Sequence, residues 1–269
     1  MSCDAAMNPP LHFEFCFRFT LASLLLIFFV APASAGLPET VARLKPSLVA
    51  VGTVQKSRTP VFRAIGTGFA VGDGSVIATN SHVAPVVTDP GEPELLAVLV
   101  RGAGGEFLAR AAHKIAADPE HDLALLKIDG PALKAVQLSD ASVLAVREGQ
   151  SVAFSGFPII NVLGHYPATN RAIISAISPI AIPSAFASQL GGAQIKRLAR
   201  GSFDIYQIDA NSYPGNSGSP LFDADTGEVI GIINMALVTA TKEAALSQPS
   251  GITYAIPVRY LLDLLQAVR

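Results

Sequence analysis

The sequence predicts an all-β protein built from two closed antiparallel barrels, with a short helix near the start and another at the end of residues 36–269. Short runs rich in Val, Leu and Ile recur along residues 46–256, separated by Gly, Pro or Asp-Gly turns. Regularly spaced short strands are typical of closed antiparallel sheets. The runs form two blocks, about 46–130 and 148–256, and we expect 129–149 to link them. Half of the 269 residues are apolar, enough for a large core.

Each element has its own local signal. The first block contains the strand-like runs Leu48–Thr53, Thr67–Val71, Ser75–Thr79, Leu95–Arg101 and Leu123–Ile128. The second contains Ser151–Ser155, Ala172–Ile177, Asp204–Asp209, Val229–Asn234 and Ile252–Ile256. The Asp-Gly pair at 73–74 predicts a tight hairpin. A short helix is expected at Leu37–Leu44, before Pro46. An amphipathic terminal helix is expected at 257–268, where a proline suits the first turn and leucines recur on one face.

Residues 1–35 are predicted to be a signal peptide. Phe19–Ala31 is almost wholly apolar, and the small residues Ala-Ser-Ala at 33–35 form a cleavage pattern. The apolar core of about thirteen residues is shorter than the ~20 of a spanning helix, although an uncleaved anchor stays an alternative. Both cysteines, Cys3 and Cys16, lie in this segment, so we expect no disulfide after cleavage. We expect an exported protein, periplasmic or secreted, in a bacterial envelope.

Charge and histidine spacing exclude several classes of partner. The chain has 19 Lys and Arg against 21 Asp and Glu, a net charge of −2. This balance gives no reason to expect nucleic acid as a partner, or stable membrane association once the signal peptide is removed. No histidine pair has helix or zinc-motif spacing, so we expect no metal and no cofactor. His113, His121 and His165 are expected to be surface or structural residues, and the oligomeric state stays open.

Three separate stretches carry the functional signal. Residues 209–222 read DANSYPGNSGSPLF, with Ser217 between glycines on a forced turn. Such a turn can present the serine hydroxyl to a cleft and aim the amides of Gly215 and Ser217 at a developing negative charge. His82 follows an apolar run in TNSHV, and Asp122 opens the apolar run DLALLKI. His, Asp and Ser is a known chain order of the hydrolytic triad.

Alternatives to this triad are weaker. Asp118 competes with Asp122 for the acid, but it precedes a proline in a turn. The non-catalytic alternative for His82 is a histidine packed in a loop. The non-catalytic alternative for Asp122 is an aspartate that starts or caps a strand. An α/β-hydrolase is excluded, because its G-x-S-x-G elbow would need glycine where Ser219 stands and its triad runs Ser, acid, His.

TNSHV at 79–83, DLALLKI at 122–128 and PGNSGSPLF at 214–222 resemble the trypsin-like serine peptidases, and the nearest branch is the bacterial HtrA/Deg-type proteases. GTGFAV at 66–71 and GITYAIP at 251–257 match as well, so the resemblance spans about residues 40–262. It implies two six-stranded barrels with the active site between them, and catalytic roles for His82, Asp122 and Ser217. The chain stops at Arg269, so we expect a protease domain without the PDZ module usual in this branch.

The resemblance also implies an oxyanion hole and a specificity pocket. The hole would use the backbone amides of the loop at the serine, Gly215, Asn216 and Ser217. The pocket would have an uncharged base and walls that suit small or medium apolar side chains. Its residues would be Asn211, Ser212, Ile233, Asn234, Met235, Gly251 and Thr253. The leading hypothesis is therefore a serine endopeptidase acting on polypeptides. A binding or chaperone-like module on a protease scaffold and an esterase remain as alternatives.

Overall fold

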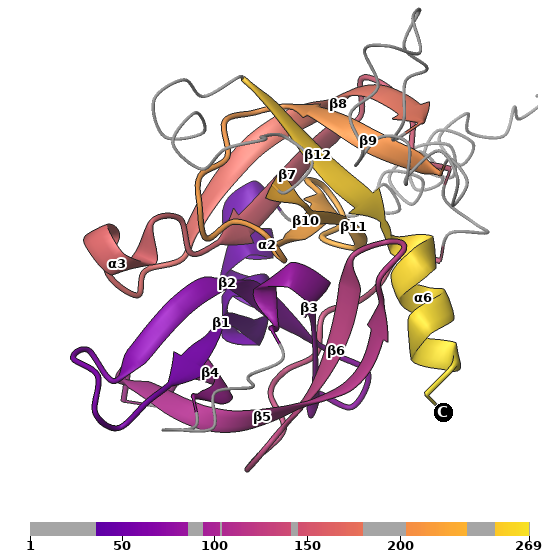
Figure 1. Cartoon of the computed structure of the whole chain (residues 1–269). Coiled ribbons are helices and arrows are strands. Elements are labelled where there is room, and N and C mark those ends of the chain that lie inside the picture. Colours follow the sequence, from indigo (N-terminus) through magenta and orange to yellow (C-terminus); the bar gives the residue numbers. More distant parts are fainter. Residues whose placement is uncertain are drawn as a thin grey trace, which may run out of the picture. The chain divides into compact units, whose positions relative to one another are not determined.

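The computed structural model describes residues 36–85, 94–102, 104–140, 145–179, 203–235 and 251–268 (Figure 1). The segment 1–35 lies outside the described residues, so the signal peptide and its cleavage stay a prediction. Segment 236–250, which follows the expected pocket wall, also lies outside them.

The first block of strands closes into an antiparallel barrel. Its strands are β1 (Leu48–Val54), β2 (Phe62–Val71), β3 (Val76–Asn80), β4 (Leu95–Arg101), β5 (Phe107–Asp118) and β6 (Leu123–Ile128). They follow the order β1-β2-β3-β6-β5-β4 around the barrel. The predicted hairpin is present, because β2 and β3 pair in antiparallel fashion on either side of residues 72–75.

The second block closes in the same way. Its strands are β7 (Ser151–Gly156), β8 (Ala168–Pro179), β9 (Asp204–Asp209), β10 (Pro220–Asp223), β11 (Val229–Ile233) and β12 (Ile252–Pro257). They follow the order β10-β11-β12-β9-β8-β7. The helical elements are α2 (Leu37–Leu44), η1 (Lys45–Ser47), η2 (Ser81–Val83), α3 (Ile160–Leu163) and α6 (Val258–Gln266). The predicted fold class is confirmed, including both terminal helices; β5 and β10 are strands beyond those predicted.

Strands between the barrels are buried on both faces. In β1, Val49 and Val51 join a cluster drawn from the first barrel, whereas Leu48 and Ala50 join a cluster that contains residues of both barrels. In the second barrel, Phe222 joins the shared cluster, while a third cluster is drawn from that barrel and its flanks. Burial on both faces explains why these strands are continuous apolar runs rather than alternating ones. The shared cluster is a hydrophobic contact between the barrels.

The connecting segment contacts both barrels. The Val136 amide donates to the Ala70 carbonyl in β2 at 2.9 Å. Further along, Leu138 forms an isolated parallel bridge to Val229 in β11, flanked by two backbone hydrogen bonds of 2.9 Å. The predicted linker therefore helps to hold the two barrels together.

The C-terminal helix α6 packs beside the turn between β5 and β6 (Figure 1). Tyr260 stacks on His121, with ring centroids 3.8 Å apart and an interplanar angle of 15°. Phe203 meets the His121 ring edge-on at 4.5 Å, and Asp118 bonds the same ring at 2.5 Å. His121 is thus a packed structural residue, and because Asp122 follows it, the helix steadies the turn that carries the candidate acid.

Replacing Tyr260 by alanine should loosen this contact. We expect Tyr260→Ala to lower the free energy of unfolding by about 1–3 kcal/mol, because an aromatic pair and its buried surface are both lost. Tyr260→Phe keeps the ring and should retain most of that stability, although it loses the hydrogen bond from Arg259. Urea unfolding of the three proteins checks this; equal losses for both variants would show that the hydroxyl, not the stacking, matters.

Asp223 makes a pH-dependent contribution to the free energy of unfolding. Burial alone would raise the pKa of the Asp223 carboxyl, but hydrogen bonds from Thr226, Gln150 and Asp225 outweigh it and hold the pKa below its usual value. The stabilisation is therefore complete above the unfolded pKa of about 3.9 and is lost as pH falls through the lower folded value. Melting temperatures of wild type and Asp223→Asn should differ at pH 7 and converge as the pH falls through the lowered pKa of Asp223 in the folded protein. The exposed Asp225→Asn is the matched control, and a gap that persists in acid would contradict the assignment.

Candidate active site

The register between β3 and β6 brings His82 and Asp122 together. These antiparallel strands pair Asn80 with Leu123, so the residues after β3 meet those before β6. The Ser81 amide donates to the Asp122 carbonyl at 2.9 Å, and the Asn80 side chain donates to the same oxygen at 3.2 Å. Pairing of two apolar runs thus delivers a histidine and an aspartate to one end of the first barrel.

Both carboxylate oxygens of Asp122 accept hydrogen bonds. Oδ2 lies 2.5 Å from His82 Nδ1 and accepts from Asn234 Nδ2 at 2.8 Å, while Oδ1 accepts from the His82 amide at 3.0 Å. Because a carboxylate only accepts, the ring proton belongs on Nδ1, and Nε2 is left as an acceptor. Asp122 adopts a φ of 53°, in the left-handed region that aspartate enters more readily than most residues.

Ser217 lies in the loop between β9 and β10 and is 6% exposed. Its Oγ accepts a hydrogen bond from the Met235 amide at 3.3 Å. The preceding residue, Asn234, donates to Asp122, so two consecutive residues contact the carboxylate and the serine. All three candidate residues therefore converge from the two barrels. Within the described ranges, no hydrogen bond joins Ser217 Oγ to His82.

Glycine is required at two positions of the serine loop. Gly215 and Gly218 have φ values of 104° and 85°, which other residues rarely adopt. A Cβ added to Gly215 would lie 2.2 Å from the Phe157 carbonyl oxygen, and one added to Gly218 would lie 2.0 Å from the Thr67 carbonyl oxygen. The loop thus turns sharply because its backbone approaches two other backbone segments.

The carbonyl groups of this loop are held in place one after another. Pro214 O accepts from the Ile159 amide at 2.7 Å, and Asn216 O accepts from the Ser219 amide at 3.0 Å. The two carbonyls that alternate with these bond to Thr67: Gly215 O accepts from its Oγ1 at 2.7 Å, and Ser217 O from its amide at 2.8 Å. Every peptide plane from 214 to 217 is therefore fixed on its oxygen side.

The amide groups of the loop divide into two kinds. The Asn216 amide donates to Tyr213 O, and the Gly218 amide donates to Ile233 O, each at 2.9 Å. The amides of Gly215 and Ser217 donate to no group that the structure describes. Of the three amides expected in the oxyanion hole, Asn216 is thus used inside the turn. The other two remain available to a developing negative charge.

Three residues of the expected specificity pocket are fully buried. Ile233 packs in the cluster of the second barrel, and the Asn234 side chain donates a hydrogen bond to Asp122. The Thr253 hydroxyl donates to the Ala210 carbonyl at 2.7 Å. These side chains support the pocket region from behind rather than facing solvent.

The other four pocket residues are more accessible. Asn211 is exposed, and an added Cβ on Gly251 would lie 4.0 Å from its Oδ1, so the two positions are neighbours. Ser212 and Met235 are each 9% exposed. Asn211 and Gly251 are therefore the pocket positions most open to a bound side chain.

Sequence reasoning did not identify Thr67 or Phe157 as part of the site. Thr67 is fully buried in β2, and its Oγ1 also accepts from the Phe157 amide at 3.0 Å. It lies inside the motif GTGFAV, but only its position near the serine loop reveals its partners. The signal available in the sequence was a polar residue between two glycines in a mostly apolar run.

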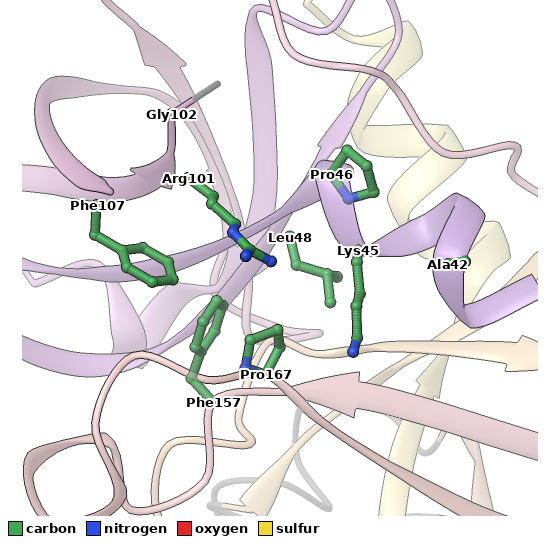
Figure 2. A pocket seen from close by; sticks show the side chains of 9 residues that line it. All are labelled: Ala42, Lys45, Pro46, Leu48, Arg101, Gly102, Phe107, Phe157 and Pro167. Carbon is green, nitrogen blue, oxygen red and sulfur yellow. The ribbon is translucent and has the colours of Figure 1, made fainter. Parts of the chain in front are cut away.

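A separate cavity of about 500 Å³ lies beside the first barrel, with Phe157 and Pro167 of the second barrel in its wall. Its lining residues are Ala42, Lys45, Pro46, Leu48, Arg101, Gly102, Phe107, Phe157 and Pro167, and Figure 2 shows Lys45 and Arg101 among these apolar side chains. None of the candidate catalytic or pocket residues lines this cavity.

No cluster of three or more metal-ligating side chains occurs among the residues described. Of the helices that can be described, none has the length and apolarity to span a membrane.

A family model described as the trypsin-like peptidase domain matches residues 66–232. The probable periplasmic serine endoprotease DegP-like of Halomonas elongata is 33% identical over 211 residues, 77% of this chain and 35% of the relative. The protein of the same name from Pseudomonas fluorescens is 31% identical over 202 residues, 75% of this chain and 34% of the relative. The chain thus spans about a third of the length of these relatives.

Solved structures of HtrA-type proteases resemble this chain as well. The HtrA-type protease AlgW with tripeptide superposes with a TM-score of 0.59 at 26% identity, covering 87% of this chain and 64% of that one. The serine endoprotease from Yersinia pestis shares the fold, with a TM-score of 0.57 at 24% identity, covering 87% of this chain and 66% of that one. The chain therefore belongs to the trypsin-like peptidase family, among serine proteases of the HtrA/Deg type.

Proposed function

We propose that this chain is a serine endopeptidase that hydrolyses polypeptides through an acyl-enzyme intermediate on Ser217. The observation that carries the proposal is that Asn234 and Met235, consecutive in the chain, contact Asp122 and Ser217. His82 is hydrogen-bonded to the same carboxylate, and the amides of Gly215 and of Ser217 itself donate to no group among the described residues. Membership of the trypsin-like peptidases supports the same chemistry.

The acylation step uses each of these groups once. Ser217 Oγ attacks the carbonyl carbon of the scissile bond while His82 Nε2 takes the hydroxyl proton. The Met235 amide donates to Oγ and so leaves that proton free for the imidazole. As the new C–O bond forms, the carbonyl oxygen becomes an oxyanion, which the amides of Gly215 and Ser217 stabilise. His82 then returns the proton to the leaving amine as the C–N bond breaks, and water releases the acyl group by the same route.

Asp122 serves this cycle by holding the imidazole. Its Oδ2 keeps the ring proton on Nδ1 and stabilises the imidazolium formed during attack. The bonds from Asn234 and from the His82 amide fix the carboxylate itself, so the ring has one preferred orientation.

The pocket favours small or medium apolar side chains before the scissile bond. Its base carries the uncharged, exposed Asn211, and Met235 lies beside the serine. No carboxylate is among the seven expected pocket residues, so nothing there selects Lys or Arg.

The N-terminal segment and the names of the relatives support a proposed site of action outside the cytoplasm. Residues 1–35 have the composition of a signal peptide, and the relatives are named periplasmic. The enzyme is therefore exported, to the periplasm or out of the cell, and its substrates there are polypeptides. It binds no nucleic acid and does not associate stably with a membrane.

Substitution of the triad tests the catalytic assignment. Wild type should digest unfolded casein and take up a fluorophosphonate probe on Ser217, and Ser217→Ala should abolish both. His82→Ala should lower turnover by on the order of a million-fold, as in related triads. Asp122→Asn should lower it about ten-thousand-fold, because the imidazole loses its preferred tautomer.

His113→Ala is the matched control, since His113 is 70% exposed and pairs loosely with Asp129 at 3.9 Å. It should leave both activities intact. Absence of labelling and cleavage in folded wild type would instead favour a binding module on a protease scaffold, and labelling with turnover of esters alone would favour an esterase.

A peptide library tests the pocket. Cleavage should follow small or medium apolar residues, and Asn211→Asp should increase cleavage after Arg and Lys about tenfold, because it introduces a partly screened negative charge at the base. Mass spectrometry of the products gives the preference. Dominance of Arg or Lys in the wild-type products would overturn this specificity.

A further inference from the structure

Thr67, in the first barrel, makes two hydrogen bonds to the serine loop, residues 214–218. It is fully buried in β2, where Ala50 of β1 is its partner. Its amide donates to Ser217 O at 2.8 Å, and its hydroxyl donates to Gly215 O at 2.7 Å. One side chain thus reaches across the boundary between the barrels to the loop that carries the nucleophile.

The polarity of the hydroxyl contact is settled by its neighbours. The Phe157 amide can only donate, and it lies 3.0 Å from Thr67 Oγ1. The hydroxyl therefore accepts from Phe157 and gives its single proton to Gly215 O. The Phe157 amide, the Thr67 hydroxyl and the Gly215 carbonyl thus form a chain of two hydrogen bonds. This chain fixes the orientation of the hydroxyl, because rotating its proton away would leave Gly215 O without this donor.

The proton of the Thr67 hydroxyl matters because Gly215 has no side chain that could restrain its backbone conformation. The Gly215 N–H lies in the peptide plane of Pro214 O, and the Ser217 N–H lies in the plane of Asn216 O. The peptide between these two planes carries Gly215 O and sets the direction of one N–H relative to the other. Pro214 O accepts from Ile159 in the second barrel, while Gly215 O accepts from Thr67 in the first. Without the hydroxyl, one of the two restraints on a glycine at φ 104° disappears.

We propose that Thr67 is a positioning residue for the oxyanion hole: its hydroxyl fixes the peptide between Gly215 and Asn216, so that the amides on either side of that peptide, those of Gly215 and Ser217, point at the same oxygen. The proposal rests on the proposed function. Thr67 touches no reacting atom; it acts through the carbonyl groups of the serine loop.

The kinetic consequence is specific. An oxyanion exists only after attack, so a poorly oriented donor weakens the transition state and leaves substrate binding unchanged. Thr67→Val, which has the same shape without the hydroxyl, should lower kcat on an amide substrate by about 10- to 100-fold, less than the full loss of a donor. KM should stay close to that of wild type.

Three matched variants separate positioning from stability. Thr67→Ser keeps the hydroxyl and should restore kcat to near the wild-type value. Thr79→Val removes an equally buried threonine hydroxyl, one that donates to Thr67 O at 2.7 Å and makes no hydrogen bond to the serine loop. It should lose stability and keep kcat. Thr67→Cys, with a weaker donor of similar size, should give an intermediate kcat, and replaces Thr67→Val in the comparison if the valine variant does not fold.

A peptide boronate provides the second readout, because its adduct with Ser217 carries a tetrahedral anion. Its inhibition constant should rise in Thr67→Val by the same factor as kcat/KM falls, and stay unchanged in Thr67→Ser and Thr79→Val. The proposal is overturned if Thr67→Val keeps wild-type kcat, if only KM rises, or if Thr79→Val loses kcat equally. A wild type with no labelling at Ser217 would instead overturn the proposed function.

Discussion

The contact between Thr67 and the loop of residues 214–218 is the constraint on which the candidate site depends. The candidate base His82 and the candidate acid Asp122 belong to one barrel and the candidate nucleophile Ser217 to the other, so their relative positions depend on the boundary between the barrels. At that boundary the backbones approach so closely that Gly218 has no room for a Cβ beside the Thr67 carbonyl. Two hydrogen bonds from Thr67 then fix the loop in register with β2. Hydrophobic packing brings the barrels together, but these directional bonds set the position of the serine.

A second connection continues from the end of β11. The Ile233 amide donates to Ser219 O and the Gly218 amide donates to Ile233 O, both at 2.9 Å, so the strand runs antiparallel to the serine loop. Beyond Ile233 the chain must therefore pass Ser217, and the next two residues reach it and Asp122. An ordinary β-ladder thus positions residues that no single motif contains.

The fold class could be predicted from short apolar runs together with the family resemblance, and the triad candidates could be named because each lies in a recognisable local motif; the catalytic roles of these candidates stay a prediction. Strands buried on two faces are continuous apolar runs, and the serine loop needs glycine where φ is positive. Strand β5 gave no such signal, since its exposed and buried residues are mixed and rich in Ala. β10 is only four residues long and starts at Pro220. Asn234 was expected in a pocket wall because the resemblance to the trypsin-like peptidases implied it; only the tertiary structure reveals its hydrogen bond to Asp122.

Most of the unpaired buried polar atoms among the described side chains lie near the same place. Ser139 Oγ, in the segment that connects the barrels, is the exception. The others are Asn80 Oδ1, Ser219 Oγ and both polar atoms of the Asn216 side-chain amide, and each of these three residues lies within two positions of His82 or Ser217. A buried unpaired polar atom typically costs about 1–3 kcal/mol, so a sequence selected for stability alone would replace them with apolar residues. Their concentration beside the catalytic candidates indicates that local stability has been given up there for a fixed backbone geometry. The hydrophobic cluster that the two barrels share lies beside the candidate site, and the burial of its apolar side chains offsets part of this cost.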